Sequence, residues 1–272
     1  MRTCKAVLVC LTLLATILNT DSVRSAAQEG FRKIRTIEFI GNKSFSPPAL
    51  ANALRLVKDG KPAAQDMVDY DIEVNLKAFL QENGYLQCEV SGQLVSINAK
   101  EAKLEIHVSE GPQYRIEALN VHGFEPFSKE EIYAQFQLNP GEIANHTKIN
   151  NALKSIGQMF RERGYIDWDC ISDQSRDPIR GTVSLTFTFE PGIQYRVAYV
   201  GFVGCDSQAQ EELLRQSVSI QPGDIYKNSK FEETRTAINR TGLFRKMAEE
   251  DYAIYPAKEG FLGIVFWLTP RK

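Results

Sequence analysis

Apolar and polar residues alternate in three short runs, each of which ends just before a glycine. In the first run, Ile37 and Phe39 alternate with Thr36 and Glu38. A period of two is typical of a half-buried strand. The runs at 114–122 and 195–203 hold the same place in the chain, so we expect strands at 34–40, 114–122 and 195–203.

Each of these strands is followed by two predicted helices. The first helix is short, and in the second case Ser128 and Glu131 have the spacing of a capping box. The second helix is longer and ends before Gly84, Gly164 or Gly242, as expected where the chain turns left-handed. Its apolar residues recur every three or four positions, in the first case at Val68, Ile72, Leu76, Phe79 and Leu80.

Two further strands close each segment. The last one is clear, because Leu104, Ile106 and Val108 alternate with polar residues. We place the strand before it at 85–90, 165–171 and 244–252. The order β-α-α-β-β predicts an α+β fold, in which two helices cover one face of a three-stranded mixed sheet and the other face meets water.

The whole pattern occurs three times. The glycines that follow the first strands are Gly41, Gly123 and Gly204, which lie about eighty residues apart. A segment of that length holds a small core of its own, unlike the shorter units of a solenoid. We therefore predict three tandem domains, at 33–112, 113–193 and 194–270.

The first 26 residues have a different composition. Arg2 and Lys5 precede an apolar run at 6–18, which is too short to span a bilayer. Small residues at Ser25 and Ala27 permit cleavage. This pattern predicts a signal peptide at 1–26 and export of the chain; a buried helix is the alternative.

Charge and cysteine content argue against nucleic-acid binding and against a fold held together by disulfides. The chain of 272 residues carries a net charge of -2, and it shows neither the basic excess nor the basic stripe that is typical of a nucleic-acid binder. Cys88, Cys170 and Cys205 would remain after export, and an odd number excludes a complete set of internal disulfides. We expect these three cysteines to be small buried hydrophobes.

The sequence also lacks signs of catalysis. The three histidines, His107, His122 and His146, are scattered, without a spacing suited to a metal. No nucleophile elbow, phosphate loop or dinucleotide fingerprint occurs. The sequence predicts a protein that is not an enzyme and uses no cofactor or metal.

The repeated joins resemble those of a known family. A glycine after the first strand, "GY" at Gly84 and Gly164, and "EGPQYRI" from Glu110 are similar to the polypeptide-transport-associated (POTRA) domain. The resemblance covers about 33–270, although the third domain has "GLF" in place of "GY". It implies a periplasmic location at the outer membrane. It further implies a role in β-barrel protein assembly, with unfolded outer-membrane protein precursors or β-barrel assembly components as partners.

Two alternatives remain open from the sequence. Members of the family normally continue into a β-barrel, whereas this chain ends at "TPRK". A free-standing module and a fragment of a longer translocation protein both fit, and membrane contact would occur only through a barrel or partner. A structural spacer or scaffold in a cell-envelope complex is a second interpretation of the same domains.

The joins supply one set of candidate residues. Tyr114 and Arg115, and likewise Tyr195 and Arg196, stand at the start of a domain. We expect them to fix the joint between domains and not to bind a ligand. The charged helix ends "QENGY" and "RERGY" are expected to be solvated.

Two kinds of binding surface are predicted. An edge strand of such a sheet offers unpaired backbone groups, to which an extended segment of another polypeptide can add as a further strand. The alternative is an unused edge shielded by charges such as Glu89, Asp167 and Asp169.

The last strand of the third domain supplies the second surface. Here Phe261, Val265 and Trp267 replace the outward threonines at 182, 186 and 188. Three aligned apolar residues on a face that should meet water indicate a docking site for a partner. Cover by another segment of the same chain is the alternative.

Overall fold

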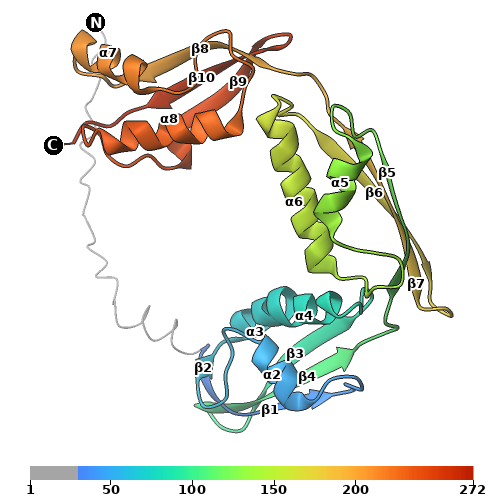
Figure 1. Cartoon of the computed structure of the whole chain (residues 1–272). Coiled ribbons are helices and arrows are strands. Elements are labelled where there is room, and N and C mark those ends of the chain that lie inside the picture. The colour runs from blue at the N-terminus through green and yellow to red at the C-terminus, as the bar shows by residue number, and fades with distance from the viewer. Residues whose placement is uncertain (1–29, 272) are drawn as a thin grey trace, which may run out of the picture. The chain divides into compact units, whose positions relative to one another are not determined.

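Three sheets with their helices follow one another along the chain (Figure 1). The computed structural model describes residues 30–271. The predicted signal peptide at 1–26 lies outside these residues. The α+β class and the mixed sheets are confirmed.

The first sheet has four strands in the order β2-β1-β4-β3. β1 and β4 are parallel, whereas β3 and β4 are antiparallel. The two-residue strand β2 was not predicted; it pairs with the start of β1. The elements are β1 (Arg32–Ile40), α2 (Pro47–Ala53), β2 (Pro62–Ala63), α3 (Gln65–Asp71), a π-helical segment η1 (Ile72–Leu76), α4 (Lys77–Glu82), β3 (Glu89–Ser96) and β4 (Glu101–Ser109).

The second and third sheets have three strands each, in the orders β5-β7-β6 and β8-β10-β9. In both, the first and last strands are parallel and the middle strand of the sequence lies at the edge. The second set comprises β5 (Arg115–His122), α5 (Lys129–Phe136), α6 (His146–Glu162), β6 (Asp169–Asp177) and β7 (Thr182–Glu190). The third comprises β8 (Arg196–Val203), α7 (Gln208–Ser217), α8 (Asn228–Arg240), a 3-10 turn η2 (Glu249–Asp251), β9 (Tyr252–Lys258) and β10 (Phe261–Trp267).

The predicted helix signals are present. The hydroxyl of Ser128 accepts from the N–H of Glu131, and the Glu131 carboxylate accepts from the N–H of Ser128, which completes the capping box. The chain has a positive φ at Gly84, Gly164 and Gly242, where the long helices end. Only the long helix of the first domain departs from expectation, because five of its residues form the π-helical segment.

The predicted positions of the edge strands were wrong by several residues. The edge strands β3, β6 and β9 begin at Glu89, Asp169 and Tyr252. These starts lie near the ends of the predicted segments, 85–90, 165–171 and 244–252. In the first domain the N–H of Tyr85 donates to Leu80 and that of Cys88 to Tyr85, so the chain still turns there. The turn that ends the helix therefore includes residues that the sequence predicted to be the start of the strand.

The described residues divide into two compact units by contact density. One holds the described residues up to 77 together with 89–109, and the other holds 78–88 and the chain from 110 onward. Within the second unit, Phe160 packs against Phe127 and Trp168, with ring centroids 5.0 and 5.8 Å apart. In the third sheet, Phe231 and Phe266 stack at 5.8 Å. No helix among residues 30–271 has the length and apolar character needed to cross a bilayer.

Candidate functional site

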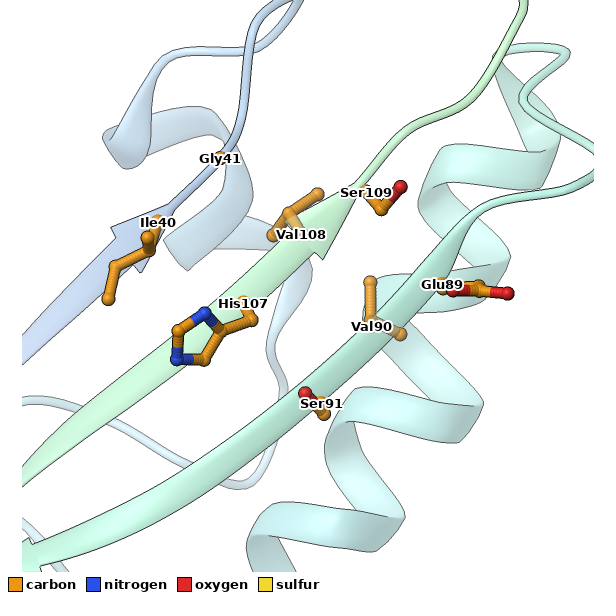
Figure 2. Close-up of a pocket in the computed structure, with 8 residues that line it drawn as sticks. All are labelled: Ile40, Gly41, Glu89, Val90, Ser91, His107, Val108 and Ser109. Atoms are coloured by element: carbon orange, nitrogen blue, oxygen red, sulfur yellow. The ribbon is translucent and has the colours of Figure 1, made fainter.

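Within the described part of the chain, no group of three or more histidine, cysteine, aspartate or glutamate side chains is placed to hold a metal ion. A wide hollow of about 440 Å³ lies at the ends of β1, β3 and β4 (Figure 2). Ile40, Ser91 and His107 share one face there, as the strand register requires. Glu89 also lines the hollow, and the register places it opposite Ser109, whereas His107 lies opposite Ser91.

The first predicted joint residues lie in the second compact unit, with segment 78–88. The N–H of Tyr114 donates to the carbonyl of Gly84 at 2.9 Å, and its hydroxyl donates to the side chain of Gln87. The carbonyl of Tyr114 accepts from Ala144 at 3.0 Å. Tyr114 is fully buried, so its backbone and ring connect the end of one long helix to the start of the next.

The second joint repeats this geometry. The N–H of Tyr195 donates to the carbonyl of Gly164 at 2.8 Å, and its hydroxyl donates to Asp167 at 2.7 Å. This hydrogen bond to Asp167 raises the pKa of the Tyr195 hydroxyl. The two arginines act elsewhere: Arg115 donates to the carbonyl of Gly141 at 2.9 Å, and Arg196 to that of Gly223 at 3.1 Å. Each arginine therefore holds the glycine turn of its own domain.

Two residues of these joints were missed by the sequence analysis. Glu82 accepts from the hydroxyl of Thr147 at 2.7 Å, and Glu162 accepts from the N–H and hydroxyl of Ser229 at 2.6 and 2.7 Å. The interpretation of "QENGY" and "RERGY" as solvated helix ends was wrong for these carboxylates. Glu82 and Glu162 each stand two positions before the glycine that ends the long helix. This repetition is the sequence signal from which their role could have been predicted.

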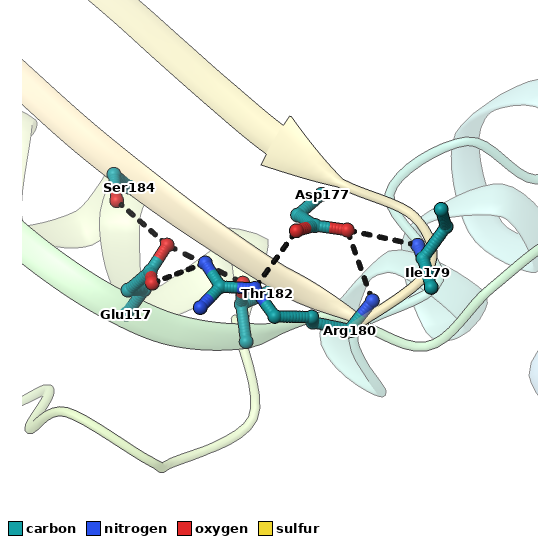
Figure 3. Close-up of polar contacts among 6 residues, drawn as sticks. All are labelled: Glu117, Asp177, Ile179, Arg180, Thr182 and Ser184. Atoms are coloured by element: carbon teal, nitrogen blue, oxygen red, sulfur yellow. Dashed lines mark hydrogen bonds and ion pairs between the residues drawn. The ribbon is translucent and has the colours of Figure 1, made fainter.

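The outer faces of the first two sheets are mainly polar, with Ile40, Val95 and Ile171 as exposed apolar exceptions. On the first, Lys103 pairs with Glu38 and Glu105. On the second, the carboxylate of Glu117 accepts from the hydroxyls of Thr182 and Ser184, both at 3.3 Å, and pairs with Arg180 (Figure 3). Asp177 accepts from the N–H of Arg180 and of Ile179 at 3.0 Å (Figure 3). Both faces are thus suited to water.

The outer face of the third sheet is apolar and aromatic. The register places Gly263 opposite Tyr199 and Tyr255, and Trp267 opposite Val203. A side chain at Gly263 would meet the ring of Tyr199, which therefore lies across the glycine. Several of these side chains are well exposed: Val203 by 52%, Trp267 by 42%, Tyr199 by 40% and Tyr255 by 38%. Phe261 and Val265 are half-buried. We call this surface the third-sheet face.

The last feature is a small pocket between helix α6 and edge strand β6. It has a volume of about 110 Å³, and its apolar lining includes Leu153, Leu185 and Phe187. Ser172 and Gln174 of β6 form its polar side. His146 stands at the start of α6, and burial lowers the pKa of its imidazole.

Comparison with known proteins identifies the fold. The family model described as "POTRA: Surface antigen variable number repeat" matches three times, at residues 32–111, 114–192 and 195–269. The crystal structure of POTRA domains 3–5 of BamA from Haemophilus influenzae is similar, with a TM-score of 0.69 at 20% identity. The match covers 88% of this chain and 96% of that one.

Two curated proteins that are much longer than this chain are also similar to it. A putative outer membrane protein assembly factor of Treponema pallidum is 25% identical over 224 residues, which cover 78% of this chain and 26% of that protein. The outer membrane protein assembly factor BamA of Buchnera aphidicola is 26% identical over 238 residues, covering 83% and 38% respectively. The chain thus spans about a quarter to two-fifths of these relatives. The three matches of the family model take in most of the chain, and the chain belongs to the POTRA family.

Proposed function

We propose that this chain is a non-catalytic, periplasmic module in the assembly of outer-membrane proteins, and that it binds extended segments of unfolded precursors by strand addition. The observation that carries the proposal is the repeated mixed sheet whose middle strand in the sequence, β3, β6 or β9, lies at an edge. The names of the curated relatives, outer membrane protein assembly factors, support the pathway.

The physical argument concerns what an edge strand recognises. Its unpaired N–H and carbonyl groups bind a peptide backbone, so affinity does not depend on one sequence. Outer-membrane precursors consist of segments of about ten residues with alternating apolar side chains. Such segments are extended and present a backbone of the kind that an edge accepts.

We propose that the third-sheet face docks a folded component of the same assembly machinery. Its apolar character contrasts with the mainly polar outer faces of the two other sheets in this chain. The curated relatives carry more than half of their length outside the part matched here, so those proteins contain further chain for such a face to contact. The partner would cover Trp267 and Val203 with an apolar surface of its own.

A spacer or scaffold role is the second candidate. It is favoured by the joints, where Tyr114 and Tyr195 repeat the same bonds. We propose that Tyr114 and Tyr195 hold the joints in either role, and that Arg115 and Arg196 contribute by fixing the glycine turn beside each joint. A spacer alone, however, does not account for the exposed aromatic residues of the third-sheet face.

The test is binding of a β-barrel precursor to the purified chain. A urea-unfolded outer-membrane β-barrel protein, diluted and followed by fluorescence anisotropy, should bind with weak affinity, roughly micromolar. The folded form of the same protein is the control and should not bind, because its strands are already paired. Equal binding of both forms, or none of either, would leave the spacer role as the better account.

A further inference from the structure

A side chain of the first domain occupies the edge of its own sheet. The carboxamide of Gln65 donates from Nε2 to the carbonyl of Gly92 at 2.8 Å. Its Oε1 accepts from the N–H of Leu94 at 3.1 Å. A carbonyl and an N–H two residues apart on an edge strand are the groups that the N–H and the carbonyl of one residue engage when a strand adds in parallel. The Gln65 amide therefore takes the place of the N–H and the carbonyl of such a residue.

The first domain also leaves no space beneath this amide. A methyl group added at Gly92 would lie 2.2 Å from Cδ1 of Ile72 and 3.0 Å from Cγ1 of Val68. The helix is thus packed directly against β3 at this point. Both the backbone groups and the side-chain position of an incoming strand are already taken.

The second domain is open at the same place. Gln65 and His146 both begin the long helix, and Val68 corresponds to Ile149 three residues later. The register makes Gly92 and Leu94 equivalent to Ser172 and Gln174, because their partners Ile106 and Phe187 hold the same place in β4 and β7. These residues line the pocket of about 110 Å³ beside β6.

His146 does not replace the glutamine in the described structure. Its Nδ1 lies 3.2 Å from Nδ2 of Asn150, within the same helix. Leu153 takes the position of Ile72, and the helix here is a regular α-helix of 17 residues without a π-helical segment. The pocket therefore occupies the place that Gln65 and its neighbours fill in the first domain.

In the third domain, an aromatic ring fills the position beside edge strand β9 that corresponds to the pocket of the second domain. Tyr252 is equivalent to Ser172, and its ring contacts Phe231 with centroids 5.0 Å apart. Arg235, at the position of Leu153, lies over the same ring at 5.6 Å. In addition, Pro256 in β9 has no N–H to offer to a further strand.

We infer that the β6 edge is the strand-accepting site of this chain, and that Gln65 closes the equivalent edge of the first domain. The inference rests on the proposed strand addition. The ligand is an extended polypeptide segment. The N–H of one of its residues donates to the carbonyl of Ser172, and the carbonyl of the same residue accepts from the N–H of Gln174, as the Gln65 amide does at β3. An apolar side chain of the segment enters the pocket against Leu153 and Phe187.

The experiment uses a peptide of about ten residues in which valine and serine alternate. Amide hydrogen exchange of the full chain, with and without this peptide, reports which strand becomes protected. We expect protection in β6. His146→Gln, which places the glutamine of the first domain at the second, should weaken peptide binding about tenfold, because two backbone hydrogen bonds are lost to the ligand.

Gln65→Ala tests the other half of the inference. It should free the N–H of Leu94, so that this amide exchanges faster and the peptide now also protects β3. The matched control is Gln216→Ala, which removes another exposed glutamine and should change neither result.

The outcomes separate this inference from the proposed function. Protection of β3 or β9 in the wild-type chain, with β6 unchanged, would overturn the assignment while strand addition stands. Protection of β5 or β8, the other edge strands of their sheets, would likewise overturn the assignment to β6. Absence of protection at every sheet edge would refute both. Full binding in folded His146→Gln would show that the pocket beside β6 is not the site.

Discussion

At the residue scale, Asp71 is the clearest case of a side chain that holds the fold locally. It is fully buried, and its carboxylate accepts from the N–H groups of Arg55, Leu56 and Val57 at 2.8 to 3.1 Å. The side chain of Asn75 donates to it at 2.7 Å. Burial acts to raise the pKa of Asp71, but these hydrogen bonds together outweigh burial and lower it.

Replacing Asp71 by asparagine should destabilise the first domain by about 2–4 kcal/mol, because an amide group would face backbone donors inside the protein. Urea unfolding at pH 7 measures this loss. The folded pKa is below the unfolded one, so the contribution of Asp71 is present above the unfolded value of 3.8 and disappears as the pH falls through the folded value. Asp59→Asn, at an exposed turn, is the control. Equal stability of both variants at pH 7 would contradict this account.

Cys170 provides a second residue-scale prediction. Burial, with the nearby charge of Asp169, raises the pKa of its thiol to about 11. An ordinary cysteine titrates near 8.5, so at pH 8 iodoacetamide should modify Cys170 roughly a hundredfold more slowly than a peptide thiol. Mass spectrometry of the alkylated chain measures the rate. A rate equal to that of a peptide would show that Cys170 does not face the core.

At the element scale, prediction from sequence succeeded where a strand has one apolar face. β4 and β7 alternate because one side packs on helices, and the capping box at Ser128 depends only on neighbouring residues. β6 was misplaced because nearly all its residues are exposed and polar, so it has no period. The contact of Gln65 with β3 joins residues 27 apart and leaves no local pattern at all.

The third-sheet face offers a test of packing at the same scale. Phe261, Val265 and Trp267 changed together to threonine should cost less than about 1 kcal/mol, because these side chains face outward. The control is Ile264→Ala on the inner face of the same strand, which should cost about 2–5 kcal/mol. Thermal unfolding distinguishes the two. A large loss in the threonine variant would mean that the face is covered by its own chain and is not a docking surface.

At the scale of the whole molecule, the repeated joints decide whether neighbouring domains act together. The join before the third domain uses the hydroxyl of Tyr195 on Asp167 and the carboxylate of Glu162 on Ser229. These bonds recur at the equivalent positions Tyr114 and Glu82. We propose that the bonds of Tyr195 and Glu162 define the join before the third domain, where a linker without such bonds would be flexible.

Tyr195→Phe should loosen the second joint without unfolding either neighbour. Loss of one hydrogen bond of about 1 kcal/mol raises local opening about fivefold, so limited proteolysis near 190–195 should speed up by that factor. The matched control is Tyr133→Phe, whose hydroxyl donates to Leu119 within one domain. Cleavage at the same rate in wild type and Tyr195→Phe would show that this bond does not hold the joint.

The central claim is that the chain binds unfolded outer-membrane polypeptides at sheet edges. The most direct measurement is amide hydrogen exchange of the full chain in the presence of a urea-unfolded β-barrel precursor, resolved to individual strands. The account predicts slower exchange along β6, with the amides of the central strands β4, β7 and β10 unchanged. Protection confined to the helices or to the outer faces of the sheets, or no protection anywhere, would contradict it.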